Sequence, residues 1–258
     1  MNFAANLTML FTEYDFLDRF EKAYKNNFKA VEYLFPYDYN PQELKNLLNE
    51  FNLKQALHNL PAGDWNNGER GIACHPDRID EFKNGVDTAI EYAKTLNCNQ
   101  LNCLIGIPPE GISEEELENL IIDNLKYASD KLKNEEIILL IEAINTIDIP
   151  GFYLNTTEQA KAIIKKVKSD NIFIQYDAYH MQIMEGNLSL TLRDNIEIIK
   201  HIQIADHPGR NEPGTGEINY DFLFKYIQSI GYEGYIGCEY NPYNGTENGL
   251  KWLKWKIL

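Results

Sequence analysis

Short apolar runs alternate with amphipathic helical patterns along the whole chain of 258 residues, and this alternation is what most constrains the fold. Apolar runs of about four to eight residues between turn signals are typical of buried strands. Strands are expected at about 3–9, 30–35, 55–60, 100–106, 137–145, 172–179, 201–206 and 234–240. Helices are expected at about 13–27, 41–51, 79–97, 114–133, 156–168, 189–199, 220–230 and 246–257.

Eight strands that alternate with eight helices in about 250 residues are typical of a (β/α)8 barrel. A doubly wound open sheet is the alternative, but it usually has fewer strands, and no glycine-rich phosphate loop follows the first strand here. No linker or shift in composition divides the chain. We therefore expect an α/β fold with one TIM barrel domain over residues 1–258.

Polar residues interrupt the apolar runs near the ends of four successive strands, in IILLIEAIN, IFIQYDAYH, HIQIADH and GYIGCEYN. A charge is costly to bury there without a partner. In a barrel the carboxyl ends of the strands share one face, so these side chains are expected to converge. They are Glu142, Asp177, Gln203 and Glu239.

Two of these residues are suited to proton transfer. If Glu142 and Glu239 both point inward, one can take a proton from carbon while the other moves one between oxygens. Asp177 adds a third carboxylate, and three like charges repel unless a proton or a cation joins them. With Gln203 the set offers four oxygen donors and no thiolate, which favours Mg²⁺ or Mn²⁺ over Zn²⁺. Whether a metal is required stays open.

Four further residues are candidates for binding the substrate. His180 lies three residues after Asp177, and His58 has a similar location near a strand end, although a lone histidine there is about as often a core residue. Arg210, after the seventh strand, and Arg70, after the third, can each grip a carboxylate in a bidentate manner. Either arginine can instead be a solvated loop cation.

The connection from Pro61 to Arg78 is too long for an ordinary loop between a strand and a helix. It can be a lid that excludes water, or a packed surface loop. Two other polar residues lie in apolar runs. Glu32 can line the pocket or be a paired structural charge, and His201 begins its strand and is expected at the opposite face.

The net charge of −15 gives no electrostatic surface for nucleic acid or an anionic membrane, although a small anionic substrate remains compatible with it. No apolar run reaches about 18 residues, so no membrane span is expected. The four cysteines form no CxxC pair and no disulfide framework, and the N-terminus lacks a basic signal-peptide region. A cytoplasmic protein is expected. The oligomeric state, including a homo-oligomer, stays open.

Segments that are characteristic of one known family occur along essentially the whole chain. They are FAANLTMLF, VEYLFPYDY, LHNLPAGDWNNGERGIAC, IEAIN with DIPGF, IQYDAYHMQ, HIQIAD with EPGTGEINY, and GYIGCEY. The stretches around PAGDW and EPGTGEINY are the most specific, whereas IEAIN alone is weak. On these segments the chain resembles the hydroxypyruvate isomerase family of the xylose-isomerase-like TIM barrel superfamily.

The resemblance implies interconversion of hydroxypyruvate and 2-hydroxy-3-oxopropanoate through an enediolate. The family's acid/base pair falls on Glu142 and Glu239, and the superfamily's metal positions fall on these two together with Asp177 and Gln203. Related sugar epimerases usually have histidine where Gln203 stands, which makes tight metal binding an open question. His180 matches a substrate-binding position. No nicotinamide, flavin or pyridoxal phosphate is implied.

Three rival functions differ from this reading. The nearest is an isomerase for a longer 2-oxo acid such as 2-dehydrotetronate. An apurinic endonuclease shares the superfamily fold but needs a basic groove and a histidine-rich metal cluster, and the chain has five histidines and a net charge of −15. A non-catalytic barrel that binds sugar acids needs no opposed glutamates.

Overall fold

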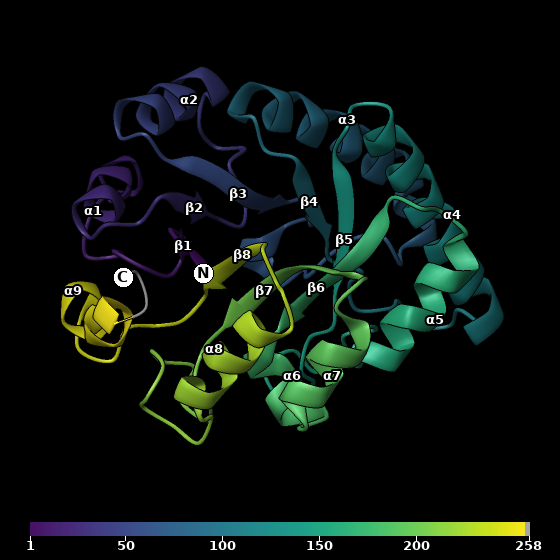
Figure 1. Cartoon of the computed structure of the whole chain (residues 1–258). Coiled ribbons are helices and arrows are strands. Elements are labelled where there is room, and N and C mark those ends of the chain that lie inside the picture. The colour runs from purple at the N-terminus through teal and green to yellow at the C-terminus, as the bar shows by residue number, and fades with distance from the viewer. Residues whose placement is uncertain (256–258) are drawn as a thin grey trace.

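The computed structural model describes residues 1–255, and these form a closed barrel of parallel strands in the order β1 to β8, with the helices around it (Figure 1). The expected TIM barrel is confirmed. The strands are β1 Asn2–Asn6, β2 Ala30–Glu32, β3 Lys54–Asn59, β4 Gln100–Cys103, β5 Ile138–Glu142, β6 Ile172–Asp177, β7 Ile199–Ile204 and β8 Tyr235–Cys238.

The α-helices agree with the predicted segments except at three places, one of which is the last segment, where α9 covers only Thr246–Gly249 and a 3-10 helix follows at Leu250–Trp255. Asp177 ends β6 and begins a short helix, α6, where a longer strand was expected, and the first helix starts later than expected, after a 3-10 turn at Phe16–Asp18. The helices are α1 Arg19–Lys25, α2 Pro41–Glu50, α3 Ile79–Leu96, α4 Glu114–Lys133, α5 Thr157–Val167, α6 Ala178–Met184, α7 Leu188–Asn195, α8 Tyr220–Ser229 and α9 Thr246–Gly249.

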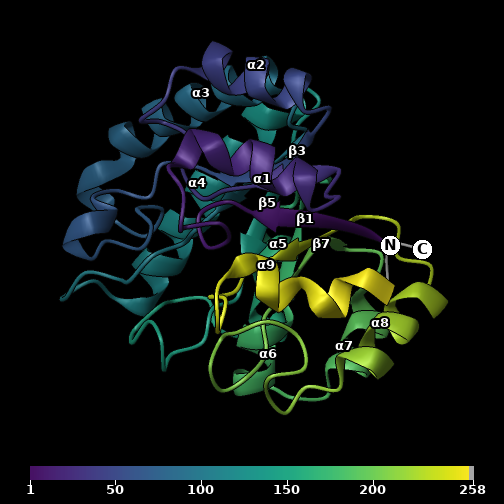
Figure 2. The ribbon, with the colours of Figure 1, turned by 90° about the vertical axis from the view of Figure 1, so that its left-hand side faces the viewer.

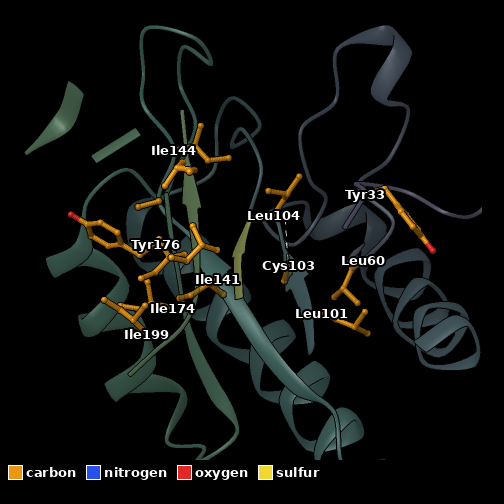
Figure 3. Close-up of a cluster of buried hydrophobic side chains, with 14 of the residues drawn as sticks. Tyr33, Leu60, Leu101, Cys103, Leu104, Ile141, Ile144, Ile174, Tyr176 and Ile199 are labelled. Carbon is orange, nitrogen blue, oxygen red and sulfur yellow. Dashed lines mark hydrogen bonds between the residues drawn. The ribbon is translucent and has the colours of Figure 1, made fainter. Parts of the chain in front are cut away.

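The strands carry apolar side chains toward the helices and polar side chains toward the barrel axis. Ile141, Ile174 and Ile199 are register partners on β5, β6 and β7, and Figure 3 shows them gathered on one side of these strands. The next residue along β5, Glu142, is paired with Gln175 on β6. Because successive side chains alternate between the faces of a strand, this second row lies inside the barrel.

Alanines fill the barrel interior below the polar row. Ala4, Ala30 and Ala56 form a small buried cluster of their own, separate from the main core between the strands and the helices. Small residues at one level leave room for larger ones at the next, as in other closed barrels. The polar side chains above them therefore sit toward the carboxyl ends of the strands.

The long connection from Pro61 to Arg78 is packed against the barrel mouth. Arg78 forms an ion pair with Glu69 at 2.5 Å, inside the same segment. Gly71 and Gly106 bring two loops together so closely that a Cβ on Gly71 would lie 2.2 Å from the carbonyl oxygen of Leu104. Of the two readings of this segment, the described contacts match a packed loop.

The C-terminal segment closes the helical layer beside α8, as the yellow ribbon in Figures 1 and 2 shows. Trp252, in a 3-10 helix at Leu250–Trp255, packs at 5.4 Å from the ring of Phe3 and stacks at 5.5 Å on Phe224. The predicted last helix at 246–257 is described as far as residue 255, and its end lies outside the described residues. None of the described helices has the length and apolar character to cross a membrane.

Candidate active site

Four buried side chains converge at the carboxyl ends of β5, β6 and β8. Glu142, Asp177, His180 and Glu239 each offer one atom suited to metal binding, and these four atoms lie within 4.8 Å of one another. The three carboxylates among them are residues predicted to converge. His180 joins the three carboxylates from α6, and Gln203, the fourth predicted polar strand end, is hydrogen-bonded to Glu239 at 3.2 Å, so all four predicted side chains converge.

Glu142 ends β5 with both carboxylate oxygens inside the barrel. Its Oε2 accepts hydrogen bonds from Nδ2 of Asn102 at 3.1 Å and from Nε2 of Gln175 at 2.8 Å. Burial, together with the negative charges of Glu239 and Asp177, raises the pKa of Glu142 well above its ordinary value. This carboxyl group therefore has a high proton affinity.

Asp177 is the last residue of β6 and the N-cap of α6. Its Oδ1 accepts the backbone N–H of Tyr179 at 2.7 Å, which starts the helix directly at the site. Its Oδ2 is buried and has no hydrogen-bond partner among the described residues. Burial raises the pKa of Asp177 to about 6, against the opposing charge of Arg210.

His180 is neutral and presents an N–H to the cluster. The Oδ1 of Asn145 accepts two backbone N–H groups, so its Nδ2 must be the group that meets Nδ1 of His180 at 2.7 Å. The ring proton is then on Nε2, which lies 3.6 Å from Oδ2 of Asp177 and 3.9 Å from Oε1 of Glu142. Burial, helped by the charge of Arg210, lowers the pKa of His180 well below its ordinary value.

Glu239 directly follows β8 and faces the cluster from the other side. Its Oε1 accepts from Nδ2 of Asn6 at 3.1 Å and from Nε2 of Gln203 at 3.2 Å, while its Oε2 accepts from Arg210 at 2.7 Å. Burial raises the pKa of Glu239 to about 8, although Arg210 acts in the opposite direction. Glu239 therefore also holds a proton more strongly than an ordinary glutamate.

Arg210 reaches the site from a loop that a buried aspartate organises. Asp206 accepts three backbone N–H groups of this loop at 2.9–3.0 Å, those of Gly214, Gly216 and Ile218. Arg210 has a positive φ of 51°, and its guanidinium lies 5.2 Å from the ring centre of Tyr179. The loop holds this cation over the carboxylates at the mouth.

Gln203 lies beside Glu239, and its amide orientation follows from its neighbours. Its Nε2 faces the carboxylates of Glu239 and Glu32, and its Oε1 accepts from Nε2 of Gln175 at 2.6 Å. Two carboxylates can only accept, so the nitrogen must face them. Its Oε1 accepts this one hydrogen bond and keeps a second lone pair, so the role of Gln203 as a metal ligand stays a prediction.

Glu32 and His201 form a buried pair below the cluster. Oε2 of Glu32 lies 2.7 Å from Nε2 of His201. Of the two interpretations of Glu32, a pocket-lining residue or a paired structural charge, this contact matches the second. The expectation that His201 lies at the opposite face was wrong. β7 begins at Ile199, which moves His201 into the strand and into the barrel interior.

His58 and Arg70 do not join the cluster. On β3, His58 is paired with Leu101 of the outer row, and its ring lies 6.2 Å from that of Tyr37. Burial lowers the pKa of His58 to about 3, so it is a neutral core residue. Arg70 donates to the carbonyl oxygens of Trp65 and Glu69 and stacks over Trp65 at 4.2 Å, within its own loop.

The sequence reasoning did not single out three amides that touch the glutamates, Asn6, Asn102 and Gln175. Each stands inside an apolar run, in FAAN, QLNC and IFIQYD. A buried amide is costly unless it is hydrogen-bonded. An amide within an apolar run was therefore the sequence feature that could have identified these three residues.

Comparison with known proteins places the chain among enzymes of one fold. The sequence profile described as xylose isomerase-like TIM barrel matches residues 20–255. The hydroxypyruvate isomerase of Escherichia coli strain K12 is 54% identical over 253 residues, which cover 98% of each chain. The 2-oxo-tetronate isomerase of Haemophilus influenzae is 44% identical, with 98% of each chain covered.

Solved structures agree with this. A crystal structure described as an AP endonuclease, family 2, from Brucella melitensis superposes with a TM-score of 0.95 at 42% identity over 98% of each chain. Sugar epimerases near 20% identity, such as an L-ribulose 3-epimerase with a TM-score of 0.77, share the fold. The profile match, the identities and the closed barrel together show that the chain belongs to the xylose isomerase-like TIM barrel family.

Proposed function

We propose that this protein is an isomerase that interconverts hydroxypyruvate and 2-hydroxy-3-oxopropanoate. The E. coli relative that shares 54% of its residues over nearly the whole chain carries the name hydroxypyruvate isomerase. The observation in this chain that carries the proposal is the pair Glu142 and Glu239, whose carboxylates face one buried site from opposite sides. Two opposed carboxylates are what an aldehyde–ketone isomerisation needs.

The reaction moves one proton between carbons and one between oxygens. Hydroxypyruvate has a ketone at C2 and a CH2OH group at C3. One glutamate removes a proton from C3, which gives an enediolate, and a proton then returns to C2 while another passes from the C3 oxygen to the C2 oxygen. Both glutamates have raised pKa values, so each can hold the proton that it receives.

Two residues at the mouth are suited to hold the substrate. The Nε2–H of His180 points into the cluster and can donate to the oxygen on which negative charge develops. Arg210 can grip the substrate carboxylate, and it already pairs with the carboxylate of Glu239. Arg70 is the second candidate for the carboxylate; it lies on the loop after β3, across the barrel from β7, and donates there to the carbonyl oxygens of Trp65 and Glu69.

The residues present fit a divalent cation. Three buried carboxylates repel one another, and the unpartnered Oδ2 of Asp177 is an oxygen without a donor in the middle of the cluster. Glu142, Asp177 and Glu239 would hold Mg²⁺ or Mn²⁺, with Gln203 as the predicted fourth position. A bound cation would supply positive charge to the developing enediolate oxygen.

A longer 2-oxo acid is the second candidate substrate. Relatives at 42% and 44% identity are named 2-oxo-tetronate isomerases. A cavity of about 590 Å³ lies between loops that follow β1, β2 and β3, but its lining includes none of the cluster residues, so it does not decide between the two substrates. The same two glutamates would serve both reactions.

Two further expectations accompany the proposal. The name of the Brucella structure would suggest DNA repair, but a net charge of −15 and a site with one histidine in its cluster favour a small substrate. All four cysteines are free and buried, which agrees with a cytoplasmic location.

The test is a comparison of kcat/KM for hydroxypyruvate and 2-oxo-tetronate. Both reactions are monitored by proton NMR with Mg²⁺ present. A higher kcat/KM for hydroxypyruvate supports the proposal. A value at least tenfold higher for 2-oxo-tetronate assigns the enzyme to the second substrate, and activity on neither substrate overturns the isomerase assignment.

A further inference from the structure

Each glutamate of the cluster has one carboxylate oxygen occupied by two side-chain amides. Oε2 of Glu142 accepts from Asn102 and Gln175, at 3.1 and 2.8 Å. Oε1 of Glu239 accepts from Asn6 and Gln203, at 3.1 and 3.2 Å. The two halves of the site therefore share one construction, although their residues come from different strands.

The second oxygen of each glutamate is turned to the mouth. Oε1 of Glu142 lies 3.9 Å from Nε2 of His180, beyond hydrogen-bond distance. Oε2 of Glu239 meets the guanidinium of Arg210 at 2.7 Å. The amides thus lie on the barrel side of both carboxylates, and the groups that would meet a substrate lie on the other side.

Glu32 fixes the direction of the two amides that hold Glu239. Nδ2 of Asn6 lies 3.0 Å from Oε1 of Glu32, and Nε2 of Gln203 lies 2.8 Å from the same oxygen. Each NH2 group is therefore shared between Glu32 and Glu239, one hydrogen to each carboxylate. A flipped amide would place its oxygen against two carboxylates, so the observed orientation is strongly favoured.

Two contacts tie this arrangement to the rest of the barrel. His201 meets Glu32 at 2.7 Å and Gln100 at 3.1 Å, which anchors Glu32 from below. Nε2 of Gln175 meets Oε1 of Gln203 at 2.6 Å, which joins the Glu142 half to the Glu239 half. The amides thus form one continuous buried network beneath the cluster.

We propose that the amides of Asn6, Asn102, Gln175 and Gln203 are positioning residues that leave Oε1 of Glu142 and Oε2 of Glu239 as the oxygens that meet the substrate, with Glu32 holding the Glu239 half. The inference rests on the proposed isomerase function. These amides act through the glutamates: with one oxygen fixed by two donors, a carboxylate does not turn about its last bond, and its other oxygen keeps one direction.

Gln175→Met tests the proposal, since it removes the donors to Glu142 and Gln203 while keeping most of the side-chain volume. The matched control is Gln55→Met on β3, because Gln55 is a buried amide that donates to the carbonyl oxygen of Leu57, and no described contact joins it to either glutamate. Kinetics are measured with hydroxypyruvate at saturating Mg²⁺, and melting temperatures are compared.

We expect Gln175→Met to lower kcat by about 10- to 100-fold, with KM within about threefold of wild type, because a misdirected catalytic group costs turnover more than binding. The isotope effect on kcat for substrate deuterated at C3 should be at least as large as in wild type. Gln55→Met should keep wild-type kcat at a similar melting temperature.

Equal kcat losses in Gln175→Met and Gln55→Met, or a loss confined to KM, would overturn the positioning role. If Gln175→Met does not fold, Gln175→Asn takes its place, because its side chain is one methylene shorter and its amide lies farther from Glu142. The same results would support or overturn the proposal. An inactive wild type instead refutes the proposed function, so the two failures are distinguishable.

Discussion

Glu142 ends β5 and Glu239 follows β8, yet each turns a carboxylate oxygen to within 4.8 Å of the other across the barrel mouth. They are far apart in the chain and belong to strands that are not neighbours in the barrel. Closure of the barrel is what makes them opposing groups at one site. Burial raises the pKa of both, and nearby carboxylates, Glu239 and Asp177 for Glu142 and Asp177 and Glu32 for Glu239, raise it further, which suits groups that exchange protons with carbon.

The first prediction concerns this pair. Glu142→Gln and Glu239→Gln should each lower kcat by about 10²- to 10⁴-fold, because an amide cannot accept the proton from carbon. Circular dichroism should show an intact fold. Glu217→Gln, an exposed carboxylate bonded to Gln182, is the control and should keep its turnover. Near-normal turnover in either site variant contradicts the acid/base assignment.

The second prediction concerns the metal. Asp177→Asn should weaken Mn²⁺ binding by at least tenfold in a calorimetric titration, because it removes the negative charge of this carboxylate. The Oδ2 atom of Asp177 is buried and has no described hydrogen-bond partner. Asp170→Asn, an exposed aspartate that pairs with Lys133, serves as the control. Unchanged Mn²⁺ affinity in Asp177→Asn would exclude this carboxylate as a ligand, and full activity after chelation would show that the carboxylates work without a cation.

The third prediction concerns Arg210. Arg210→Met should raise KM for hydroxypyruvate by about 10- to 100-fold, the value of a charge-assisted contact to the substrate carboxylate. Loss of the guanidinium should also raise the pKa of Glu239 further, since Arg210 pairs with this carboxylate and its charge lowers the pKa. Arg193→Met, an exposed arginine that pairs with Asp194, should leave KM unchanged. A KM that does not move in Arg210→Met shifts the role to Arg70.

The fourth prediction is a pH dependence of stability in the metal-free protein. The pKa of Glu239 rises from its ordinary 4.5 to about 8 on folding, so the folded state keeps a proton that the unfolded chain releases. The stabilisation is complete below about pH 4.5 and is lost as the pH rises to about 8. The melting temperature should therefore fall over this range.

Glu239→Gln supplies the control for the fourth prediction, because it removes the titrating group. Its melting temperature should vary less between pH 5 and pH 8 than that of wild type, whereas Glu91→Gln on the surface of α3 should follow wild type. Identical pH profiles for Glu239→Gln and wild type would show that Glu239 is not the group whose proton is retained.

The fifth prediction uses a glycine. A Cβ on Gly237 would lie 2.3 Å from Oε1 of Glu32, so Gly237→Ala should displace that carboxylate and cost about 1–3 kcal/mol. Turnover should fall too, because Glu32 shares two amides with Glu239. In a Glu32→Ala background the added methyl should have little further effect on kcat. Independent, additive effects would separate Gly237 from Glu32.

The barrel could be predicted because eight apolar runs with helices between them admit few folds. The strand ends were less readable. Leu104 and Ile105 are buried and apolar, so they extend the pattern of β4 beyond Cys103, where the strand ends. The α6 helix was missed because Tyr179 continues the apolar pattern of β6, while the capping by Asp177 is visible only in three dimensions.

The convergence of Glu142, Asp177 and Glu239 was predicted from their places at strand ends. Which side of the strand other residues point to was not predicted correctly. His58 was expected near the mouth. The register between β2 and β3 shifts between Val31 and Glu32, so alternation along β3 could not be counted from the sequence. An error in where β7 starts likewise put His201 at the wrong face.

The most direct measurement is proton NMR of hydroxypyruvate in D2O with the wild-type protein and Glu239→Gln, with and without a chelator. The account predicts that wild type consumes the C3 proton signal, produces an aldehyde and incorporates deuterium at carbon, and that Glu239→Gln does so at least 10²-fold more slowly. Wild-type protein that neither converts hydroxypyruvate nor exchanges its C3 protons would contradict the enediolate chemistry assigned to Glu142 and Glu239.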